Sequence, residues 1–585
     1  MKKSSEITNA LNSIIKYSIY SLIFLLPIFY VPRISGDFDF SKQALLVLFV
    51  FIALFSWLLK IIFSRKVSIN LNSVNIAVLG LFLASALSTV FSVDKYGSFW
   101  GWPRISADSM ITITALAVFY FIFSSILAKK EIVRSINIFF VSVFFVEIIG
   151  IFKIFSFNTI GSLWGLGFFC ASLIPLLFMF LIENKGKMKL FFGIELFFAT
   201  IILFLVNYFV AWWVVVFGSF LILGVCLYKK DFCDRRWLFL PMFFLLMSFG
   251  MIIFNPRVNL FLQKYDELSL SQAQSFQIAL QSLKNRPILG SGPGTFAYDF
   301  FKYRDPGSGS FSSQDIAFSL AGSKFLTNMA TTGILGIVAF LALLDVVIIS
   351  GIKLFSKKTF DPLLIGLFLF FLSQSLVFFL YSSSLSLDFI YFFTIAVFCG
   401  LMFKKRKEYN FSFSGFRKAG VIFVFLFITI FGLGVLFSGC QRYLAEINYS
   451  KGIVALNSKN IDKAILNFQT AANFSPRSDL YFRALAEADV LKLQNYLSNI
   501  GDKESLTDQE KKDIETLVSN SINTAKMATD LGANNVANWM SRGYVYQNLN
   551  GLIDTAQDWA INSYNKALEL DPKNSDIPKI IEKIK

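Results

Sequence analysis

The stretch that decides the fold is residues 362–403, PLLIGLFLFFLSQSLVFFLYSSSLSLDFIYFFTIAVFCGLMF. It contains two apolar runs, 362–382 and 385–403, separated by a short polar break. About 20 apolar residues in a helix cross the hydrocarbon of a bilayer, where backbone groups must bond within the helix itself. The stretch therefore predicts two consecutive membrane-spanning helices.

The same pattern recurs along the first three quarters of the chain and predicts about thirteen spans in all. The spans are expected at 12–31, 43–63, 74–93, 110–128, 133–152, 163–182, 190–207, 209–228, 236–254, 327–350, 362–382, 385–403 and 419–439. We therefore predict an all-α, polytopic helical membrane protein, with one long loop at about 255–326.

The composition agrees with this class and excludes several others. Of 585 residues, 55% are hydrophobic and 16% are charged, whereas soluble domains average about 25% charged. The chain has no histidine, so no imidazole can serve as base, switch or metal ligand. Its five cysteines lack the paired spacing of a zinc site or a redox motif. We expect no cofactor and no bound metal.

Basic residues predict the orientation, because Lys and Arg are enriched in cytoplasmic loops. The clusters fall on one side of the membrane if the N-terminus is cytoplasmic, and the long loop and the C-terminal tail then fall on the other. We assign the net charge of +16 to this retention of loops and expect no nucleic-acid partner. The basic clusters are Lys2–Lys3, Arg65–Lys66, Lys129–Lys130, Lys185–Lys189, Lys229–Arg236, Lys357–Lys358 and Lys404–Arg406.

The tail, residues 441–585, differs from the membrane domain, residues 1–440, because its charges balance and its apolar residues return at helical spacing. Its pattern resembles tetratricopeptide repeats, helix pairs of about 34 residues, in roughly three copies. Such a stack presents a concave surface to a protein or glycan acceptor, or serves as a spacer. The outer copies are carried by Gly452, Ala464, Phe468, Ala471 and Pro476, and by Trp539, Gly543, Tyr546, Ala560, Tyr564, Ala567 and Pro572.

The long loop carries the motif that bears most directly on function, residues 285–296, NRPILGSGPGTF. Gly290, Gly292 and Gly294 alternate along it. Glycines permit positive φ and close backbone approach, so amides here are candidates to bind phosphate oxygens or sugar hydroxyls. The alternative is an ordinary Gly-Pro-Gly turn.

Three segments together resemble the O-antigen ligase and polymerase family: 285–296, then AGSKFLTNMATTGILG at 321–336, and the earlier Ser92–Arg104. The likeness covers most of residues 80–350 in order. It implies a glycosyltransferase in a bacterial inner membrane that transfers a glycan from an undecaprenyl diphosphate carrier to a glycan, lipid or protein acceptor, on the extracytoplasmic face. It also implies contacts with membrane lipid, and a tetratricopeptide tail is a known variant of the family.

The resemblance also implies site residues, although two positions depart from the family. Gly322 stands where the family places a histidine, and Gln272 stands where it places an arginine. Arginine suits a diphosphate because its planar fork bonds two oxygens, and a nearby carboxylate can take the acceptor proton. The expected catalytic residues are Arg104, Arg286, Asp299, Arg304 and Lys324, and the expected substrate contacts are Gly290, Gly292, Gly294, Tyr298 and Lys302.

Two other functions remain open at this point. Asp37 and Asp39 lie two residues apart in the first outer loop and resemble the acidic motif of metal-dependent glycosyltransferases that use lipid-linked donors. Alternatively, the protein is a non-catalytic membrane scaffold or a transporter of lipid-linked glycans that kept the fold and lost the chemistry.

Overall fold

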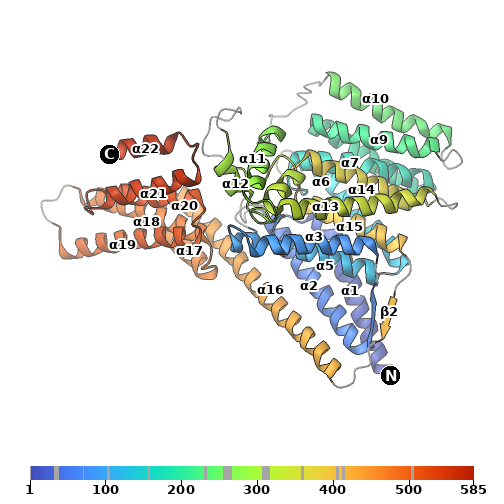
Figure 1. Ribbon diagram of the computed structural model, residues 1–585, viewed down its shortest axis with the longest axis horizontal. Helices are drawn as coiled ribbons and strands as arrows, with labels where there is room; N and C mark the ends of the chain where they lie inside the picture. The colour runs from blue at the N-terminus through green and yellow to red at the C-terminus, as the bar shows by residue number, and fades with distance from the viewer. Residues whose placement is uncertain are drawn as a thin grey trace.

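In the part of the chain that it describes, the computed structural model is helical except for one short β-ribbon and the connecting turns, and Figure 1 shows a large helical bundle beside a smaller group of helices formed by the C-terminal residues. The structure describes residues 2–31, 38–69, 72–101, 106–153, 158–228, 234–254, 267–305, 317–356, 361–403, 407–410, 416–501 and 506–585.

The bundle is built from long apolar helices. These are α1 (Lys2–Ile28), α2 (Phe38–Ser64), α3 (Ser73–Val90), α5 (Met110–Ile126), α6 (Lys129–Lys153), α7 (Leu163–Glu183), α8 (Gly186–Val206), α9 (Phe209–Tyr228), α10 (Phe239–Phe254), α13 (Lys324–Phe355), α14 (Pro362–Leu380), α15 (Leu385–Met402) and α16 (Phe416–Asn457). The shorter α4 (Lys95–Trp100), α11 (Gln272–Asn285), α12 (Phe296–Tyr303) and the 3-10 helix η1 (Arg235–Leu238) lie in connections between them.

Each of the thirteen expected spans coincides with one of these long helices. Within the described residues, twelve helices are long and apolar enough to cross a membrane, and α5 is a shorter apolar helix. These helices indicate a membrane protein. Their starts follow ordinary capping chemistry: Ser384, for example, accepts a hydrogen bond from the Leu387 amide at the start of α15.

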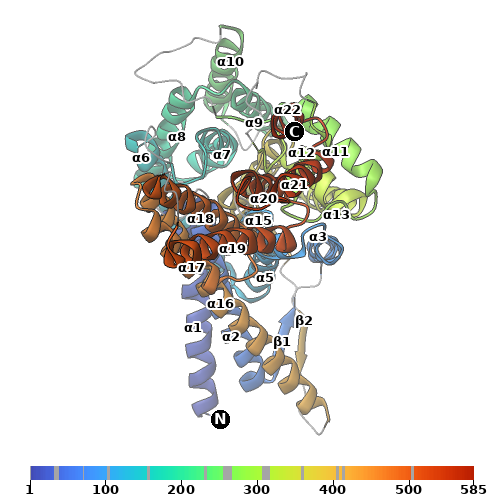
Figure 2. The same ribbon diagram turned by 90° about the vertical axis from the view of Figure 1, so that its left-hand side faces the viewer.

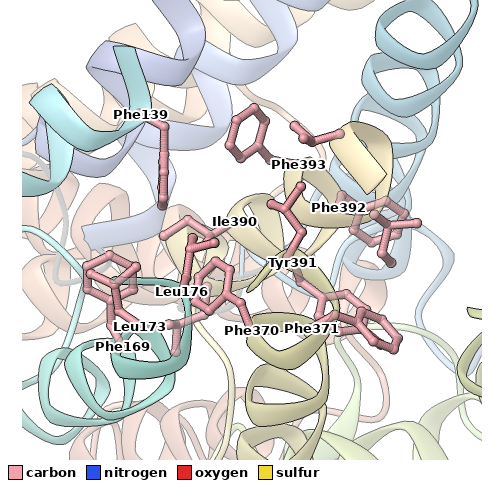
Figure 3. Packing of buried hydrophobic residues seen from close by; sticks show 14 of the residues in the cluster. Phe139, Phe169, Leu173, Leu176, Phe370, Phe371, Ile390, Tyr391, Phe392 and Phe393 are labelled. Carbon is pink, nitrogen blue, oxygen red and sulfur yellow. The ribbon is translucent and has the colours of Figure 1, made fainter. Parts of the chain in front are cut away.

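Aromatic side chains fill the centre of the bundle (Figure 3). The rings of Phe139 in α6 and Phe393 in α15 lie 5.2 Å apart, and Phe371 in α14 stacks on Tyr391 in α15 at the same centroid distance, 5.2 Å. Close aromatic pairs add about 0.5–1.5 kcal/mol each beyond burial of their area. Helices α7 and α15 are the most enclosed of the apolar helices, with 94% and 89% of their apolar windows buried, so they form the centre around which the others pack.

The β-ribbon was not predicted from the sequence. Strand β1 (Lys66–Ile69) pairs antiparallel with β2 (Lys407–Asn410), which joins the end of α2 to the segment before α16. Figure 2 shows this ribbon and the N-terminus at one end of the molecule, away from the C-terminal helices. Residues 2–3 and 65–66, two of the basic clusters that the charge pattern predicts on one side, lie at this end.

Six further helices follow α16: α17 (Ile461–Phe474), α18 (Asp479–Ile500), α19 (Asp508–Leu531), α20 (Val536–Asn548), α21 (Ala556–Leu570) and α22 (Asp576–Ile584). They pack in consecutive pairs, as the repeat pattern predicts: the end of α16 with α17, α18 with α19, and α20 with α21. A Cβ on Gly452 would lie 2.4 Å from the ring of Phe468, and one on Gly543 would lie 2.6 Å from the ring of Tyr564. Glycine at these two positions therefore lets each aromatic ring fill the space between paired helices.

The domain boundary at residue 440 falls inside one continuous helix. Helix α16 runs for 42 residues from the β-ribbon end to the first repeat (Figure 1), so the last apolar span and the first repeat helix are one element. Gly432, Gly434 and Gly439 do not break it. A rigid connection of this kind couples the position of the repeat domain to the bundle.

Candidate functional site

Three segments that the sequence analysis singled out meet at one end of the bundle. The amide of Val93 donates to the Ser291 carbonyl at 2.9 Å, and the amide of Gly292 donates to the Thr331 carbonyl at 2.8 Å. The Ser88 hydroxyl, at the end of α3, donates to the same Thr331 carbonyl at 2.9 Å. Segments far apart in the chain, around residues 92, 291 and 331, therefore form one structural unit.

A break in α13 explains why the glycine loop lies here. Gly333 has φ 63° and ψ −161°, which interrupts the helix and leaves peptide groups on both sides without helical partners. The loop supplies those partners, because the amides of Ile334 and Leu335 donate to the carbonyls of Pro287 and Ile288 at 2.9 and 3.1 Å. On the other side of the break, the Ala330 carbonyl accepts from the Ser291 amide at 3.2 Å.

The glycines of the loop allow its backbone to lie close to α13 and to Ser92. A Cβ on Gly290 would lie 2.5 Å from the Thr331 backbone, and one on Gly292 would lie 2.1 Å from the Ser92 hydroxyl. The amides of Gly290 and Gly292 both donate to carbonyls of the chain itself. These two glycines therefore contact protein, whereas the expected role was to bind phosphate. Gly294, with φ 74°, has more open surroundings, since a Cβ there would lie no closer than 3.8 Å to the Gly97 carbonyl oxygen.

Asp299 and Tyr298 of α12 hold the loop in place. The Asp299 carboxylate accepts from the hydroxyls of Ser282 and Ser291 at 2.9 and 2.5 Å. Burial raises its pKa to about 6. The Tyr298 hydroxyl donates to Asp94 at 2.9 Å, and burial raises the pKa of Asp94 as well. Both side chains thus have supporting roles in the structure, where the sequence predicted a base and a substrate contact.

The predicted basic residues have separate surroundings. Arg286 is exposed at the end of α11, and Lys302 is exposed beside the Tyr303 ring. Arg304 forms a two-pronged salt bridge with Asp571, with its Nε 3.0 Å from Oδ1 and a terminal nitrogen 2.5 Å from Oδ2. Arg104 lies outside the described residues. The expected gathering of these cations around one lipid head group is therefore not seen in the part of the chain that is described.

Of the expected catalytic residues, Lys324 lies beside a cavity and is paired with two carboxylates. At the first position of α13, its ammonium forms ion pairs with Asp108, before α5, and with Asp388, in α15, the latter at 2.9 Å. Asp388 also accepts from the Ser383 hydroxyl at 2.5 Å. All three charged groups are largely buried, with side-chain exposures of 13%, 8% and 6% for Lys324, Asp108 and Asp388. The cavity is small, about 60 Å³, and Pro293 of the glycine loop lines it beside Lys324.

A polar layer surrounds this ionic cluster. Lys42 of α2 is fully buried and donates to the Thr159 carbonyl and the Ser386 hydroxyl. Its neighbour Gln43 donates to Ser109 and Thr112 at 2.8 and 2.9 Å, which fixes the start of α5. The layer places hydroxyls, amides and charges where the helices begin and end.

Sequence reasoning missed Asp108, Asp388 and Lys42. A signal was present for one of them, because Asp388 is a charged residue within the otherwise apolar run 385–403. Ionisable residues inside such runs are rare and costly, so its presence marks a candidate site. Asp108 and Lys42 carried no comparable signal, since each lies in a polar segment before its apolar run.

Gln272 and Gly322, the two positions that depart from the O-antigen ligase pattern, are in contact. The Gln272 side-chain amide donates to the Gly322 carbonyl at 2.8 Å and to the Leu380 carbonyl at 2.9 Å. A Cβ on Gly322 would lie 2.5 Å from the Leu270 carbonyl oxygen. The backbone therefore leaves no room for a histidine here.

The acidic pair expected in the first loop is described only in part. Asp37 lies outside the described residues, and Asp39 accepts from the Leu385 amide at 3.0 Å, at the start of α15. The described residues contain no group of three His, Cys, Asp or Glu side chains that is placed to hold a metal ion.

The described residues thus form a bundle of long apolar helices joined to a domain of paired helices, with a buried ionic cluster at one end of the bundle. No family model matches the chain, and no curated protein matches it. Among solved structures, part of the chain is similar to the OM64 TPR domain of Arabidopsis, with 16% sequence identity and a TM-score of 0.19. That match covers 25% of this chain and 97% of the other.

Proposed function

We propose that this protein is a membrane glycosyltransferase that moves a glycan from an undecaprenyl diphosphate carrier to an acceptor hydroxyl, as the O-antigen ligase and polymerase family does. The observation that carries the proposal is the buried cluster of Lys324, Asp108 and Asp388 at a cavity beside the glycine loop. Charges held in an apolar bundle are costly and mark functional sites. The meeting of the three segments on which the resemblance rests gives further support.

The cluster suits proton transfer better than diphosphate binding. One ammonium faces two carboxylates, so the formal charge of the three groups is −1 and repels an anion. Among the described residues, Lys324 is the only hydrogen-bond or ion-pair partner of the Asp108 carboxylate, whereas Asp388 also bonds Ser383. Asp108 is therefore our candidate for the group that takes the acceptor proton, and Lys324 positions it.

The reaction follows directly from these roles. The acceptor oxygen attacks the anomeric carbon and passes its proton to the Asp108 carboxylate. The bond between the anomeric carbon and the diphosphate oxygen breaks, and the diphosphate leaves with the bonding electrons. Asp108 later releases the proton to water. This assignment replaces Asp299 and retains Lys324 from the expected set.

The repeat domain and the orientation belong to the same proposal. We place the N-terminus and the β-ribbon on the cytoplasmic side of a bacterial inner membrane, and the ionic cluster and the repeats on the extracytoplasmic side, where the lipid-linked donor is used. The repeats would then receive a protein or glycan acceptor. Basic loops at the ribbon end support this orientation.

A non-catalytic scaffold is the second candidate. It is favoured by the separate surroundings of the expected cations, since Arg304 is committed to Asp571 and Arg286 is exposed. A scaffold or transporter would bind the lipid-linked glycan without transferring it.

The test is transfer by purified full-length protein supplied with a lipid-linked oligosaccharide and a glycan or peptide acceptor. We expect Asp108→Asn to lower transfer at least about a hundredfold, in line with the loss of a general base. Lys187→Gln, at an exposed lysine of α8 outside the repeat domain, is the control and should retain transfer. Thermal unfolding of each variant separates lost chemistry from lost fold. Undiminished transfer by well-folded Asp108→Asn would overturn the assignment, and lipid binding without transfer by the unmodified protein would favour the scaffold.

A further inference from the structure

A second cavity lies between α2 and α16, away from the ionic cluster. Its volume is about 470 Å³, and its walls are mainly apolar side chains such as Leu45, Leu48 and Leu436. Little of either wall helix is covered by protein, because 22% of the apolar window of α2 and none of that of α16 is buried. In a bilayer, hydrocarbon chains therefore reach this groove from the side.

Arg442 of α16 lies in the wall of the groove and is 7% exposed. Its guanidinium donates to the carbonyls of Trp100 and Gly101 at 3.2 and 2.9 Å, and it lies 5.1 and 5.6 Å from the ring centres of Trp100 and Phe40. Within the described part of the chain, Arg442 forms no ion pair. One turn further along α16, the Glu446 carboxylate accepts from the Tyr481 hydroxyl at 2.8 Å.

A buried guanidinium bonded only to carbonyls keeps its full positive charge and some of its five donors. Such a group favours an anion that is brought to it, and phosphate oxygens match its planar geometry. An apolar groove that ends at this cation fits a molecule with a long hydrocarbon chain and a phosphate at one end.

The position of the groove favours one such molecule. Trp100 and Ile111 line the groove, while Ala107 and Asp108, between them in sequence, line the cavity of the ionic cluster. Gln43 lines the groove, and its side-chain nitrogen lies 3.2 and 3.1 Å from the carbonyl oxygens of Trp100 and Ser106. One short segment thus separates the cation from the proposed proton acceptor.

We infer that the groove between α2 and α16 holds the prenyl chain of a polyprenyl phosphate lipid, with Arg442 bonded to the phosphate. The inference rests on the proposed function for the choice of lipid and adds to it a binding site on the last apolar helix. A polyprenyl lipid is favoured over the phospholipids of the surrounding bilayer, because its phosphate would lie beside the segment that carries Asp108.

Cys440 provides the readout, because its thiol is exposed and lines the groove, whereas Cys170, Cys226 and Cys399 are buried. The experiment measures alkylation of Cys440 by a maleimide in full-length Cys233→Ser protein, with undecaprenyl phosphate or phosphatidylglycerol added. We expect undecaprenyl phosphate to slow alkylation and phosphatidylglycerol to have little effect.

Arg442→Gln should raise the lipid concentration that gives half of the protection roughly ten- to hundredfold, as expected for loss of charge-assisted hydrogen bonds. Arg477→Gln, at an exposed arginine of the repeat domain, should not change it.

A second pair of variants tests the groove by blocking it with a bulky side chain, so the test does not depend on whether Arg442→Gln folds. Ala44→Trp fills the groove from α2 and should abolish protection, whereas Ile430→Trp, on the exposed face of α16 and 69% exposed before substitution, should leave it intact. Equal protection by phosphatidylglycerol, or protection unchanged in both Arg442→Gln and Ala44→Trp, would overturn the inference. Because the probe carries no sugar, lipid binding without transfer would refute only the proposed function, and transfer without this binding would refute only the groove.

Discussion

Asp299 shows how burial sets the chemistry of a single side chain. Its two serine hydrogen bonds stabilise the charged form, yet the loss of hydration is larger and raises the pKa to about 6 from the value of 3.8 for a free side chain. The folded protein therefore binds this proton more tightly than the unfolded chain does. The carboxyl group contributes stability that is fully present below about pH 4 and is lost as the pH rises through about 6.

Asp299→Asn should make stability less dependent on pH. The shift corresponds to a change on the order of 3 kcal/mol between about pH 4 and pH 7, and asparagine removes the titration while its carbonyl oxygen still accepts from one serine. Thermal unfolding in detergent across this range measures the effect. Asp508→Asn, at a fully exposed carboxylate, is the control. An unchanged pH profile in Asp299→Asn would show that another group is responsible.

At the scale of the element, the broken helix α13 and the glycine loop form a pair that neither segment can form alone. The break at Gly333 leaves carbonyls and amides that the loop satisfies, and the loop reaches them because Gly290 has no side chain. A buried peptide group that lacks a hydrogen-bond partner costs about 1–3 kcal/mol, so the two segments depend on each other.

Gly290→Ala should separate the loop from α13. Its Cβ would overlap backbone atoms of Ala330 and Thr331 at 2.5–2.6 Å, and overpacking of this kind costs about 1–3 kcal/mol in addition to the strain of positive φ. Gly294→Ala is the matched control, since it shares a positive φ but has open space. Hydrogen exchange of the Ser291 and Gly292 amides should rise markedly in the first variant only. Equal exchange in both would mean that backbone strain, and not close packing, explains the glycines.

At the scale of the whole molecule, the repeat domain docks on the long loop that holds the glycines and on the segment that follows α3. Arg304 binds Asp571, whose side chain is fully buried, and the Tyr96 hydroxyl lies 3.1 Å from the Ser475 hydroxyl. The Asn534 side chain donates to the Val93 carbonyl at 2.9 Å. Together with the continuous helix α16, these contacts hold the repeats beside the end of the bundle where the ionic cluster lies.

Breaking the Arg304–Asp571 pair should loosen this docking. Arg304→Gln leaves a buried carboxylate without its cation, which costs about 3–5 kcal/mol, so residues 556–584 should become sensitive to protease. The double variant with Asp571→Asn should recover much of the loss, because neither charge then remains alone. Lys566→Gln, in an exposed pair with Glu569, should cost less than about 1 kcal/mol. Protease resistance equal to that of the unmodified protein in Arg304→Gln would show that α16 alone positions the repeats.

The orientation is testable in intact cells. In a background without native cysteines, we expect Ser458→Cys, on the repeat domain, to react with a membrane-impermeant maleimide from outside, and Lys66→Cys, on the β-ribbon, to react only after the membrane is permeabilised. Both positions are exposed in the structure, so a difference reports sidedness. The reverse pattern would contradict the assignment made from the basic loops.

The sequence by itself determined the helical spans and the repeat pairs. Both depend on local spacing: about 20 apolar residues for each span, and small residues opposite aromatic ones for each pair. The spans therefore coincide with helices, and Gly452 packs against Phe468 as expected. The spacing also located the glycine loop, although not what its amides bind.

Only the tertiary structure decided which charged groups meet. Asp108, Lys324 and Asp388 come from three segments spread over 281 residues of chain, and Arg442 reaches the carbonyls of Trp100 and Gly101 across the α2–α16 groove. A polar contact between distant segments leaves no periodic trace in a single sequence, because it depends on how the helices pack. For the same reason, the sequence predicted Arg304 at a lipid site, whereas in the structure it is paired with Asp571 of the repeat domain.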